Sequence, residues 1–283
     1  MPKFFVKGDQ INGNEITIVG EDVNHIVNVL RLKEKDEINI CNTDTRENYI
    51  AKMVGANGIR PKKAEENNRG VYHTPLQIKC RIIKKLEPKH ESNIHITIFQ
   101  GLPKADKMEL VIEKCIELGA DEVTPVEMKR CIVKLDDKTK TKKIDRWQKI
   151  AETAAKQSGR DIIPKVNEII NVKNICNLID NYDIVLLAYE EEKKNTLKAE
   201  LQNFVGAAFE GIPVRHDTTL PILRIGIIIG PEGGLEPDEV AMLKQNGAKV
   251  ITLGSRILRT ETVRNYDDRD YNVRTGRFRK VNE

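Results

Sequence analysis

Two glycine-rich segments carry the residues whose types and spacing point to chemistry. Residues 229–235 read Ile-Gly-Pro-Glu-Gly-Gly-Leu, and residues 253–262 read Leu-Gly-Ser-Arg-Ile-Leu-Arg-Thr-Glu-Thr. Each follows a β-branched run, at 225–229 and 250–253, which predicts a buried strand of a parallel sheet. Because open α/β sheets bind ligands at the carboxyl ends of their strands, both segments are predicted to line a ligand site.

The first segment also limits the kind of ligand. It matches neither G-x-G-x-x-G nor G-x-x-x-x-G-K-[ST], so the dinucleotide and P-loop interpretations lose support. No Lys follows Gly233 and Gly234, and Glu232 and Glu236 would repel a phosphate. The sequence therefore predicts a neutral or cationic ligand held by backbone groups. Glycines that serve only the turn are the alternative interpretation.

These segments resemble the cofactor-binding end of the SPOUT methyltransferases. Within them, the chain resembles the bacterial 16S rRNA (uracil-N3)-methyltransferase family. The resemblance runs from residue 1 to about Thr262 and includes the segments 1–6, 24–32, 100–108, 146–147 and 154–160. It implies S-adenosylmethionine as the cofactor and a methyl transfer to N3 of a specific uridine in 16S rRNA of the small ribosomal subunit.

The pattern along the chain predicts two domains and a tail. Residues 1–88 read as β-rich, with strands at 16–19, 37–40 and 77–83 and a polar loop at 56–72. A helix is predicted at 23–30, with an apolar face formed by Val23, Ile26, Val27 and Leu30. The resemblance implies a PUA-like RNA-binding β-barrel there. After a linker at 88–92, residues 92–262 alternate strands and helices, which is typical of an α/β domain with a parallel sheet. The resemblance adds the SPOUT fold and its deep trefoil knot.

The α/β domain has identifiable elements. Strands are predicted at 94–99, 123–126, 184–188, 225–229 and 250–253. One helix is predicted to end at Gly119 and a second at Gly159, and a third begins at Pro237 and ends at Gly247. Trp147 lies in the apolar stripe of the second helix and is predicted to be a core residue.

The resemblance also implies a set of site residues. The adenosyl pocket is expected to be formed largely by the backbone of Leu187, Gly230, Glu232, Gly233, Leu253, Gly254, Ile257, Leu258 and Thr260.

Arg259 and Glu261 are two positions apart, so in an extended loop they face the same way. They form either an internal ion pair or part of the catalytic site. Uracil N3 becomes nucleophilic only after it loses its proton. Arg259 would offset charge on a uracil carbonyl oxygen, and Glu232 or Glu261 would accept the proton. Both glutamates have capping or orienting the backbone as an alternative role.

The region from 129 to 149 holds nine cations and three acids. Such a cluster is either a solvated surface or, beside an RNA-binding domain, a surface that follows phosphates. The predicted RNA-binding residues are Arg31, Lys129, Arg130, Lys134, Gln157 and Arg160.

Composition excludes several classes. The 5 cysteines among 283 residues are scattered without C-x-x-C, which indicates reduced thiols in a cytoplasmic protein and no zinc or other metal site. No apolar run approaches the length of a membrane span, so no membrane partner is expected. The net charge of +4 by itself neither requires nor excludes nucleic acid.

The tail at 263–283 departs from the family pattern. Relatives continue with an apolar helix that packs in the dimer, whereas this tail is polar and lacks helical periodicity. It is expected to be disordered or loosely attached, and the homodimer that the resemblance implies is expected to be weakened. Two other functions stay open: a SPOUT enzyme acting on a ribose 2′-OH or another base, and a non-catalytic RNA-binding relative with a defective C-terminus.

Overall fold

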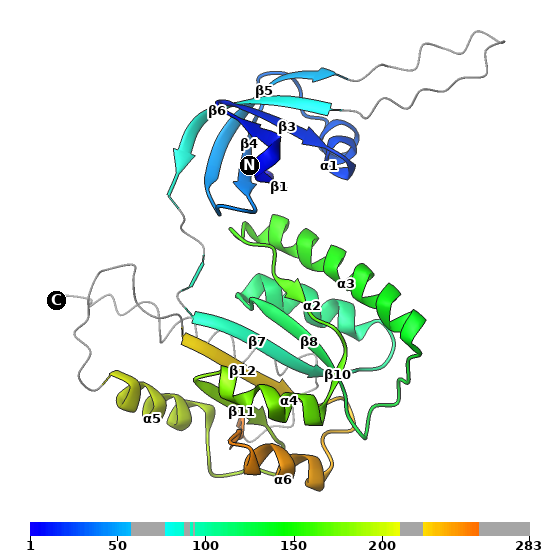
Figure 1. The fold of residues 1–283 in the computed structure, drawn as a ribbon, viewed down its shortest axis with the longest axis vertical. Helices are drawn as coiled ribbons and strands as arrows, with labels where there is room; N and C mark the ends of the chain where they lie inside the picture. The colour runs from blue at the N-terminus through cyan, green and yellow to red at the C-terminus, as the bar shows by residue number, and fades with distance from the viewer. Residues whose placement is uncertain (58–76, 88–90, 93, 210–222, 255–283) are drawn as a thin grey trace. The chain divides into compact units, whose positions relative to one another are not determined.

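The computed structural model describes residues 1–57, 77–87, 91–92, 94–209 and 223–254. The chain forms two compact units (Figure 1). Unit 1 comprises Met1–Glu91 and Gly159–Ile162, and unit 2 comprises Ser92–Ser158 and Ile163–Glu283. The chain first passes between the units within the segment predicted as a linker. The return of Gly159–Ile162 to unit 1 was not predicted from the sequence. The predicted tail at 263–283 lies outside the described residues.

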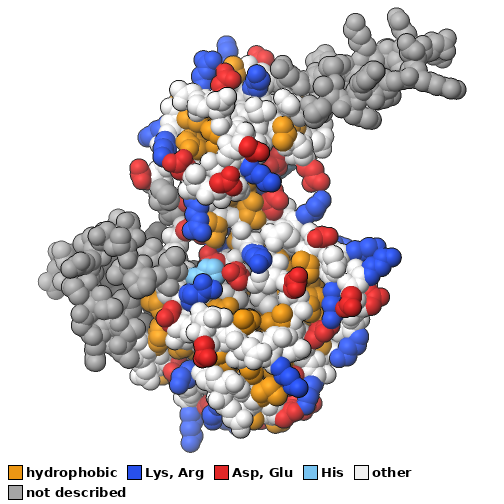
Figure 2. All heavy atoms as spheres, in the orientation of Figure 1, with side chains coloured by type: hydrophobic (Ala, Val, Ile, Leu, Met, Phe, Trp, Pro, Cys, Tyr) orange, Lys and Arg blue, Asp and Glu red, His pale blue; other side chains and the backbone are white. Residues whose placement is uncertain are grey.

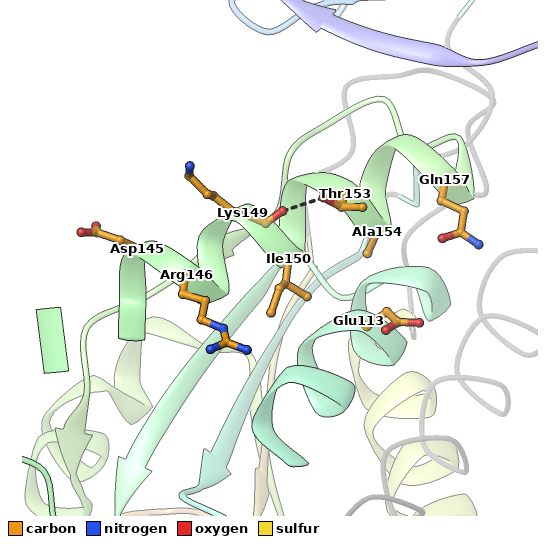
Figure 3. A pocket seen from close by; sticks show the side chains of 8 residues that line it. All are labelled: Glu113, Asp145, Arg146, Lys149, Ile150, Thr153, Ala154 and Gln157. Carbon is orange, nitrogen blue, oxygen red and sulfur yellow. Dashed lines mark hydrogen bonds between the residues drawn. The ribbon is translucent and has the colours of Figure 1, made fainter. Parts of the chain in front are cut away.

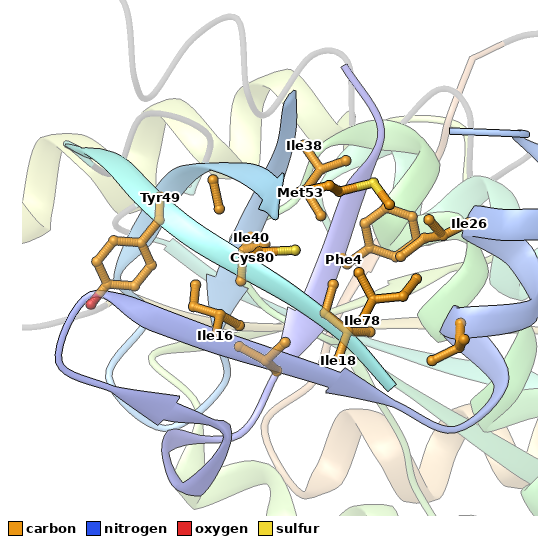
Figure 4. Close-up of a cluster of buried hydrophobic side chains, with 13 residues drawn as sticks. Phe4, Ile16, Ile18, Ile26, Ile38, Ile40, Tyr49, Met53, Ile78 and Cys80 are labelled. Atoms are coloured by element: carbon orange, nitrogen blue, oxygen red, sulfur yellow. The ribbon is translucent and has the colours of Figure 1, made fainter. Parts of the chain in front are cut away.

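Unit 1 is built on a curved, six-stranded sheet that carries one apolar core (Figure 4). Alternation places Ile16 and Ile18 of one strand, and Ile38 and Ile40 of another, in this core. The edge strand β1 runs parallel to β4, and the other neighbours are antiparallel. The strand order is β1 (Lys3–Val6), β4 (Glu37–Asn42), β5 (Asn48–Asn57), β6 (Gln77–Leu86), β3 (Glu15–Val19) and β2 (Ile11–Asn12).

The three strands predicted for this unit are confirmed, whereas β1, β2, β5 and the 3-10 turn η1 (Gly8–Gln10) were missed. The first two residues of the predicted polar loop, 56 and 57, belong to β5, so the loop was predicted to begin too early. The remainder of that loop lies outside the described residues.

The predicted helix at 23–30 is confirmed, but its second half has a different geometry. The α-helix α1 (Glu21–Asn24) continues as the π-helix η2 (His25–Val29), closed by a bond from Leu30 N to His25 O of 2.9 Å. Val23 and Ile26 are buried as expected, but Val27 is 41% exposed. The prediction that Val27 faces the core was wrong, because the wider turn rotates this side chain toward solvent.

A buried polar network closes unit 1. Lys3 is 8% exposed, and its ammonium group forms a salt bridge with Asp161 and donates to Gly159 O at 3.2 Å. Arg160, only 5% exposed, donates from Nε and Nη2 to the two oxygens of Glu91 at 3.0 and 2.7 Å. Removing one member would leave a buried charge without its partner, so the network fixes Gly159–Ile162 within unit 1.

Unit 2 contains a parallel sheet in which the five strands predicted for this domain are confirmed. Every pairing between its described strands is parallel. The trefoil knot that the resemblance implies stays a prediction, because the chain beyond Gly254 lies outside the described residues. The strand order is β10 (Ile170–Asn171), β8 (Glu122–Glu127), β7 (Ile94–Gly101), β12 (Leu223–Ile229), β11 (Ile184–Ala188) and β13 (Lys249–Ile251), with β9 (Lys165–Val166) beside β8.

Helices lie on both faces of this sheet (Figure 1). On one face α2 packs against α3, and on the other α4 packs against α6. Trp147 on α3 is 2% exposed, which confirms its prediction as a core residue. The helix α2 ends at Gly119, where φ is +118°, as predicted. The helices are α2 (Lys107–Leu118), α3 (Asp137–Ser158), α4 (Val172–Leu178), η3 (Ile179–Asn181), α5 (Leu197–Phe209) and α6 (Pro237–Gln245).

Two further properties concern the described residues alone. None of their helices combines the length and the apolar character that crossing a membrane requires. They contain no group of three or more His, Cys, Asp or Glu side chains arranged to hold a metal ion.

All five cysteines are free, and burial raises the pKa of the Cys41 thiol to about 11 and that of Cys80 to about 12.

The amino end of the parallel sheet contains one strongly perturbed carboxylate. The His95 imidazole, whose Nε2 lies 3.3 Å from Glu122 Oε1, lowers the pKa of Glu122 to about 2; burial opposes this shift, and a bond from Asn167 at 2.8 Å adds to it. Because the folded-state pKa lies below the usual value of 4.5, Glu122 stabilises the fold at neutral pH. That stabilisation is lost as pH falls from about 4.5 to about 2.

The Glu122→Gln variant is therefore expected to lose less stability than the wild type across this acid range. Thermal unfolding measured between pH 5 and pH 2 checks the difference. Glu168→Gln, at an exposed position, is the matched control and should follow the wild-type pH profile. An unchanged profile in Glu122→Gln would contradict the assigned stabilisation.

Candidate functional site

The carboxyl ends of the parallel strands meet at one edge of the sheet in unit 2. Ile229, the last residue of β12, pairs with Gln100 of β7 and with Ala188 of β11. Ala188 in turn pairs with Ile251, the last residue of β13. The loops that follow these strands therefore begin side by side, and they include both glycine-rich segments predicted from the sequence.

Glycine permits a close approach between the loops after β7 and β12. A Cβ atom on Gly101 would lie 2.6 Å from the backbone nitrogen of Pro231, a separation that real Cβ atoms essentially never show. A Cβ on Gly230 would lie 2.9 Å from Leu235 Cδ1 and 3.3 Å from the Gly234 backbone. The buried Gln100 joins the two loops, because its Nε2 donates to Gly101 O at 2.9 Å and to Gly230 O at 3.4 Å.

Glu232 belongs to this junction. Its carboxylate accepts the backbone N–H of Lys104 at 3.1 Å and lies 3.2 Å from Lys107 Nζ. Partial burial raises the pKa of Glu232, but hydrogen bonds from backbone N–H groups and the Lys107 ammonium outweigh that effect and lower it. A carboxylate held ionised in this way is a weak proton acceptor. The geometry favours the second of its two predicted roles, orienting the backbone.

Two residues predicted to bind RNA contact the acidic start of α6. Arg130 donates from Nε to Glu236 at 2.9 Å and from a terminal nitrogen to Gly233 O at 3.0 Å. Lys129 forms a salt bridge with Asp238. Arg130 holds the loop 230–235 in place and Lys129 holds the first turn of α6, so part of their charge is already offset within the protein.

The second glycine-rich segment is described as far as Gly254. Gly254 has φ of +120°, a conformation that favours glycine, and Leu253 is half-buried. Leu187 is fully buried in β11, one residue before the carboxyl end of that strand. The predicted site residues Ile257, Leu258, Arg259, Thr260 and Glu261 lie outside the described residues.

The remaining predicted RNA-binding residues differ in exposure. Arg31 in unit 1 and Lys134 and Gln157 in unit 2 are exposed, as an RNA contact requires. Arg160 is buried against Glu91, so its guanidinium is committed to a protein carboxylate. The expectation that Arg160 contacts RNA directly does not fit this placement. Nothing in the sequence around Gly159 and Arg160 indicated that the Arg160 side chain would pair with Glu91.

A groove between α2 and α3 was not predicted. It has a volume of about 620 Å³, and Ile150 and Ala154 project from α3 toward α2 in Figure 3. Figure 2 shows Lys and Arg side chains gathered over the N-terminal half of α3, with acidic side chains among them. Several of these cations pair within the protein, including Lys140 with Glu127 and Arg146 with Glu109. The groove is lined by Glu113, Asp145, Arg146, Lys149, Ile150, Thr153, Ala154 and Gln157.

The sequence analysis also did not identify two residues at the carboxyl edge of the parallel sheet. Asn195 binds the β13 backbone, and Glu190 lies against Gly234. The available signal was the run Tyr-Glu-Glu-Glu directly after the buried strand at 184–188. Its place at the carboxyl end of a strand would have marked it as part of the site.

Comparisons with known proteins agree with this architecture. A family model described as an RNA methyltransferase domain matches residues 90–265, and one described as an RNA methyltransferase PUA domain matches residues 18–60. The ribosomal RNA small subunit methyltransferase E of Bacillus subtilis is 36% identical over 246 residues, covering 87% of this chain and 85% of that protein. The protein of the same name from Mesomycoplasma hyopneumoniae is 30% identical and covers 93% of this chain and 95% of its own length.

Solved structures share the fold. A ribosomal RNA small subunit methyltransferase E from Neisseria gonorrhoeae, bound to S-adenosylmethionine, has a TM-score of 0.73 at 24% identity, covering 96% of this chain and 97% of its own. A Legionella pneumophila protein in complex with the same cofactor has a TM-score of 0.72 at 25% identity, covering 96% of each chain.

A parallel sheet with glycine-rich loops at its carboxyl edge, preceded by a PUA domain, defines an RNA methyltransferase of the SPOUT type. The chain belongs to the ribosomal RNA small subunit methyltransferase E family.

The junction of the two loops generates a stability prediction. Gly101→Ala places a Cβ against backbone that cannot move aside, so it is expected to lower the free energy of unfolding by about 1–3 kcal/mol. Urea unfolding followed by circular dichroism measures the change. The control is Gly55→Ala, whose Cβ would meet nothing closer than a side-chain oxygen at 3.9 Å. Equal midpoints for both variants would contradict the close approach.

Proposed function

We propose that this protein methylates N3 of a specific uridine in 16S rRNA of the small ribosomal subunit, with S-adenosylmethionine as the methyl donor. The observation that carries the proposal is the placement of the loops 230–235 and 252–254 at the same edge of the parallel sheet, on either side of the end of β11. The names of the relatives support the substrate, because two of them, at 36% and 30% identity, are called ribosomal RNA small subunit methyltransferase E. Such a substrate also implies a cytoplasmic location.

The residues at this edge fit the donor. Added Cβ atoms at Gly230 and Gly233 would come within 3.1 Å of the side chains of Leu235 and Arg130, so this tight course of the loop depends on glycine at both positions. We propose that Gly230, Gly233, Leu253 and Gly254 hold the donor through backbone N–H and C=O groups, with the backbone of Leu187 beside them. The acidic groups around these loops suit a cation better than a phosphate.

When bound, S-adenosylmethionine supplies a methyl group whose bond to sulfur breaks as a bond to uracil N3 forms. The protein must orient the uracil and handle its proton. We propose that Arg259 offsets the negative charge on a uracil carbonyl oxygen and that Glu261 accepts the N3 proton, since Glu232 is held ionised by Lys104 and Lys107. Because N3 lies on the Watson–Crick edge, the target base must be unpaired or turned out of its stack.

Exposed groups in each unit are available to contact RNA. We propose Arg31 in unit 1 and Lys134 and Gln157 in unit 2 as direct contacts. Arg130 primarily holds the loop 230–235 through Gly233 and Glu236, Lys129 holds the first turn of α6 through Asp238, and Arg160 positions its own segment.

The protein is expected to transfer a labelled methyl group to small ribosomal subunits that lack the modification. Digestion of the rRNA to nucleosides, followed by mass spectrometry, should show N3-methyluridine. A product methylated on ribose or on another base would support the other SPOUT activities instead. Donor binding without any transfer would support the non-catalytic alternative.

A variant at the cofactor loop serves as the control for this experiment. Gly230→Val introduces a branched side chain into the space of Leu235 and the Gly234 backbone, so donor binding should be lost. Calorimetry is expected to detect no heat of donor binding, and the methyl assay no product. Unchanged affinity would place the donor elsewhere.

We further propose that the chain forms a homodimer weakened by its polar tail at 263–283. Sedimentation velocity over a dilution series is expected to show dissociation to monomers at low protein concentration. A tight dimer at the lowest concentration would contradict a weakening effect of the tail.

A further inference from the structure

The segment 189–196, here called the strap, runs from the end of β11 to the start of α5 and is fastened to β13. Tyr189 N donates to Ile251 O at 3.0 Å, and Thr252 N donates to Asn195 O at 2.7 Å. The Asn195 side chain donates to Val250 O at 2.8 Å. Both ends of the strap are therefore held against the strand that leads into the second glycine-rich segment.

The middle of the strap is a turn stabilised by one of its own carboxylates. Glu192 N donates to Tyr189 O at 3.2 Å, and Glu192 Oε1 accepts the backbone N–H groups of Lys194 and Asn195 at 2.8 and 3.1 Å. These bonds, that from Lys194 first, lower the pKa of Glu192. Because Glu192 stabilises the turn, it is not the group of the strap that is available to a ligand.

Glu190, also in the strap, lies against the first glycine-rich loop. A Cβ atom on Gly234 would lie 2.7 Å from Glu190 Oε1, and Gly234 has φ of +68°. The space that a side chain would fill at position 234 is therefore taken by the carboxylate of Glu190. The hydrogen bonds that fasten the strap therefore hold the negative charge of Glu190 against the loop that we propose binds the methyl donor.

The other carboxylates around this loop have partners in the protein. Glu232 accepts from Lys104 and Lys107, and Glu236 accepts from Arg130. Glu190 is exposed and forms no hydrogen bond or salt bridge with any residue in the described part of the chain. After the hydrogen bond with Glu236, the charge of Glu190 is among the causes that raise the pKa of Arg130. Glu190 is thus the carboxylate at this loop whose oxygens remain available to a bound cation.

We propose that Glu190 is a specificity-determining residue of the donor site, whose carboxylate distinguishes the positively charged sulfonium of the methyl donor from its neutral thioether product. The proposal rests on the proposed function, because it assumes that the donor binds at the loop 230–235. A carboxylate near a cation contributes attraction that the demethylated product cannot receive. Such a residue would favour release of the product after each transfer.

Calorimetry with the full-length protein tests this assignment. The ligands are S-adenosylmethionine and S-adenosylhomocysteine, which differ by the methyl group and its positive charge. Glu190→Gln keeps the shape of the side chain and removes its charge. It is expected to lower the affinity for S-adenosylmethionine about tenfold, or about 1.4 kcal/mol. It should lower the affinity for S-adenosylhomocysteine less than about twofold, because that ligand has no sulfonium for the carboxylate to attract.

The matched control is Glu191→Gln, which removes the neighbouring exposed carboxylate of the same strap. It is expected to leave both affinities within about twofold of the wild type, because charges exposed to solvent at longer range are screened. Raising the ionic strength should reduce the preference of the wild type for the charged ligand and leave that of Glu190→Gln nearly constant. Equal thermal midpoints for the three proteins would show that the fold is intact.

The possible outcomes separate the two levels of the proposal. Equal losses for both ligands in Glu190→Gln would overturn the charge-based role and indicate a contact with the shared nucleoside or amino-acid groups. Unchanged affinities for both would also overturn it. A wild-type protein that binds neither ligand would refute the proposed function itself.

Discussion

The parallel register of β7, β12, β11 and β13 is the constraint on which the rest of the site depends. It brings four chain segments, distant in sequence, to the same edge of one sheet. At that edge the loops after β7 and β12 approach so closely that Gly101 leaves no room for a Cβ beside Pro231. Larger residues there would separate the loops, and the backbone groups proposed to hold the donor would lose their arrangement.

Charge at this edge is used mainly to hold the loops. Glu232 fixes the segment after β7, Arg130 fixes the segment between β12 and α6, and Lys129 fixes the first turn of α6. Interactions of this kind between exposed groups are individually weak, but several of them converge on the six residues 230–235. The same interactions remove most local charges from direct contact with a ligand. Glu190 stands apart, because the strap positions it while its oxygens remain unbound by described residues.

Local sequence signals predicted the elements well where the hydrophobic pattern was strong. The β-branched runs at 94–99, 184–188 and 225–229 are buried strands, and the stripe containing Trp147 is the buried face of α3. Prediction failed where the pattern was short or the backbone unusual. The four-residue strand β1 is buried on both faces and shows no alternation. The π-helical turn moved Val27 to the surface, because no propensity marks where a helix widens.

The sequence by itself determined the types of the main elements, the places where glycine brings backbone close to a ligand, and the family. It did so because periodicity and glycine positions are local properties, which can be recognised from neighbouring residues without knowing the tertiary contacts. Only the tertiary structure decided the partners of the charged residues: Arg130 with Glu236, Arg160 with Glu91, and Glu232 with Lys107. These pairs join residues that are far apart in the chain, so their roles depend on the pairing of strands and not on the neighbouring sequence.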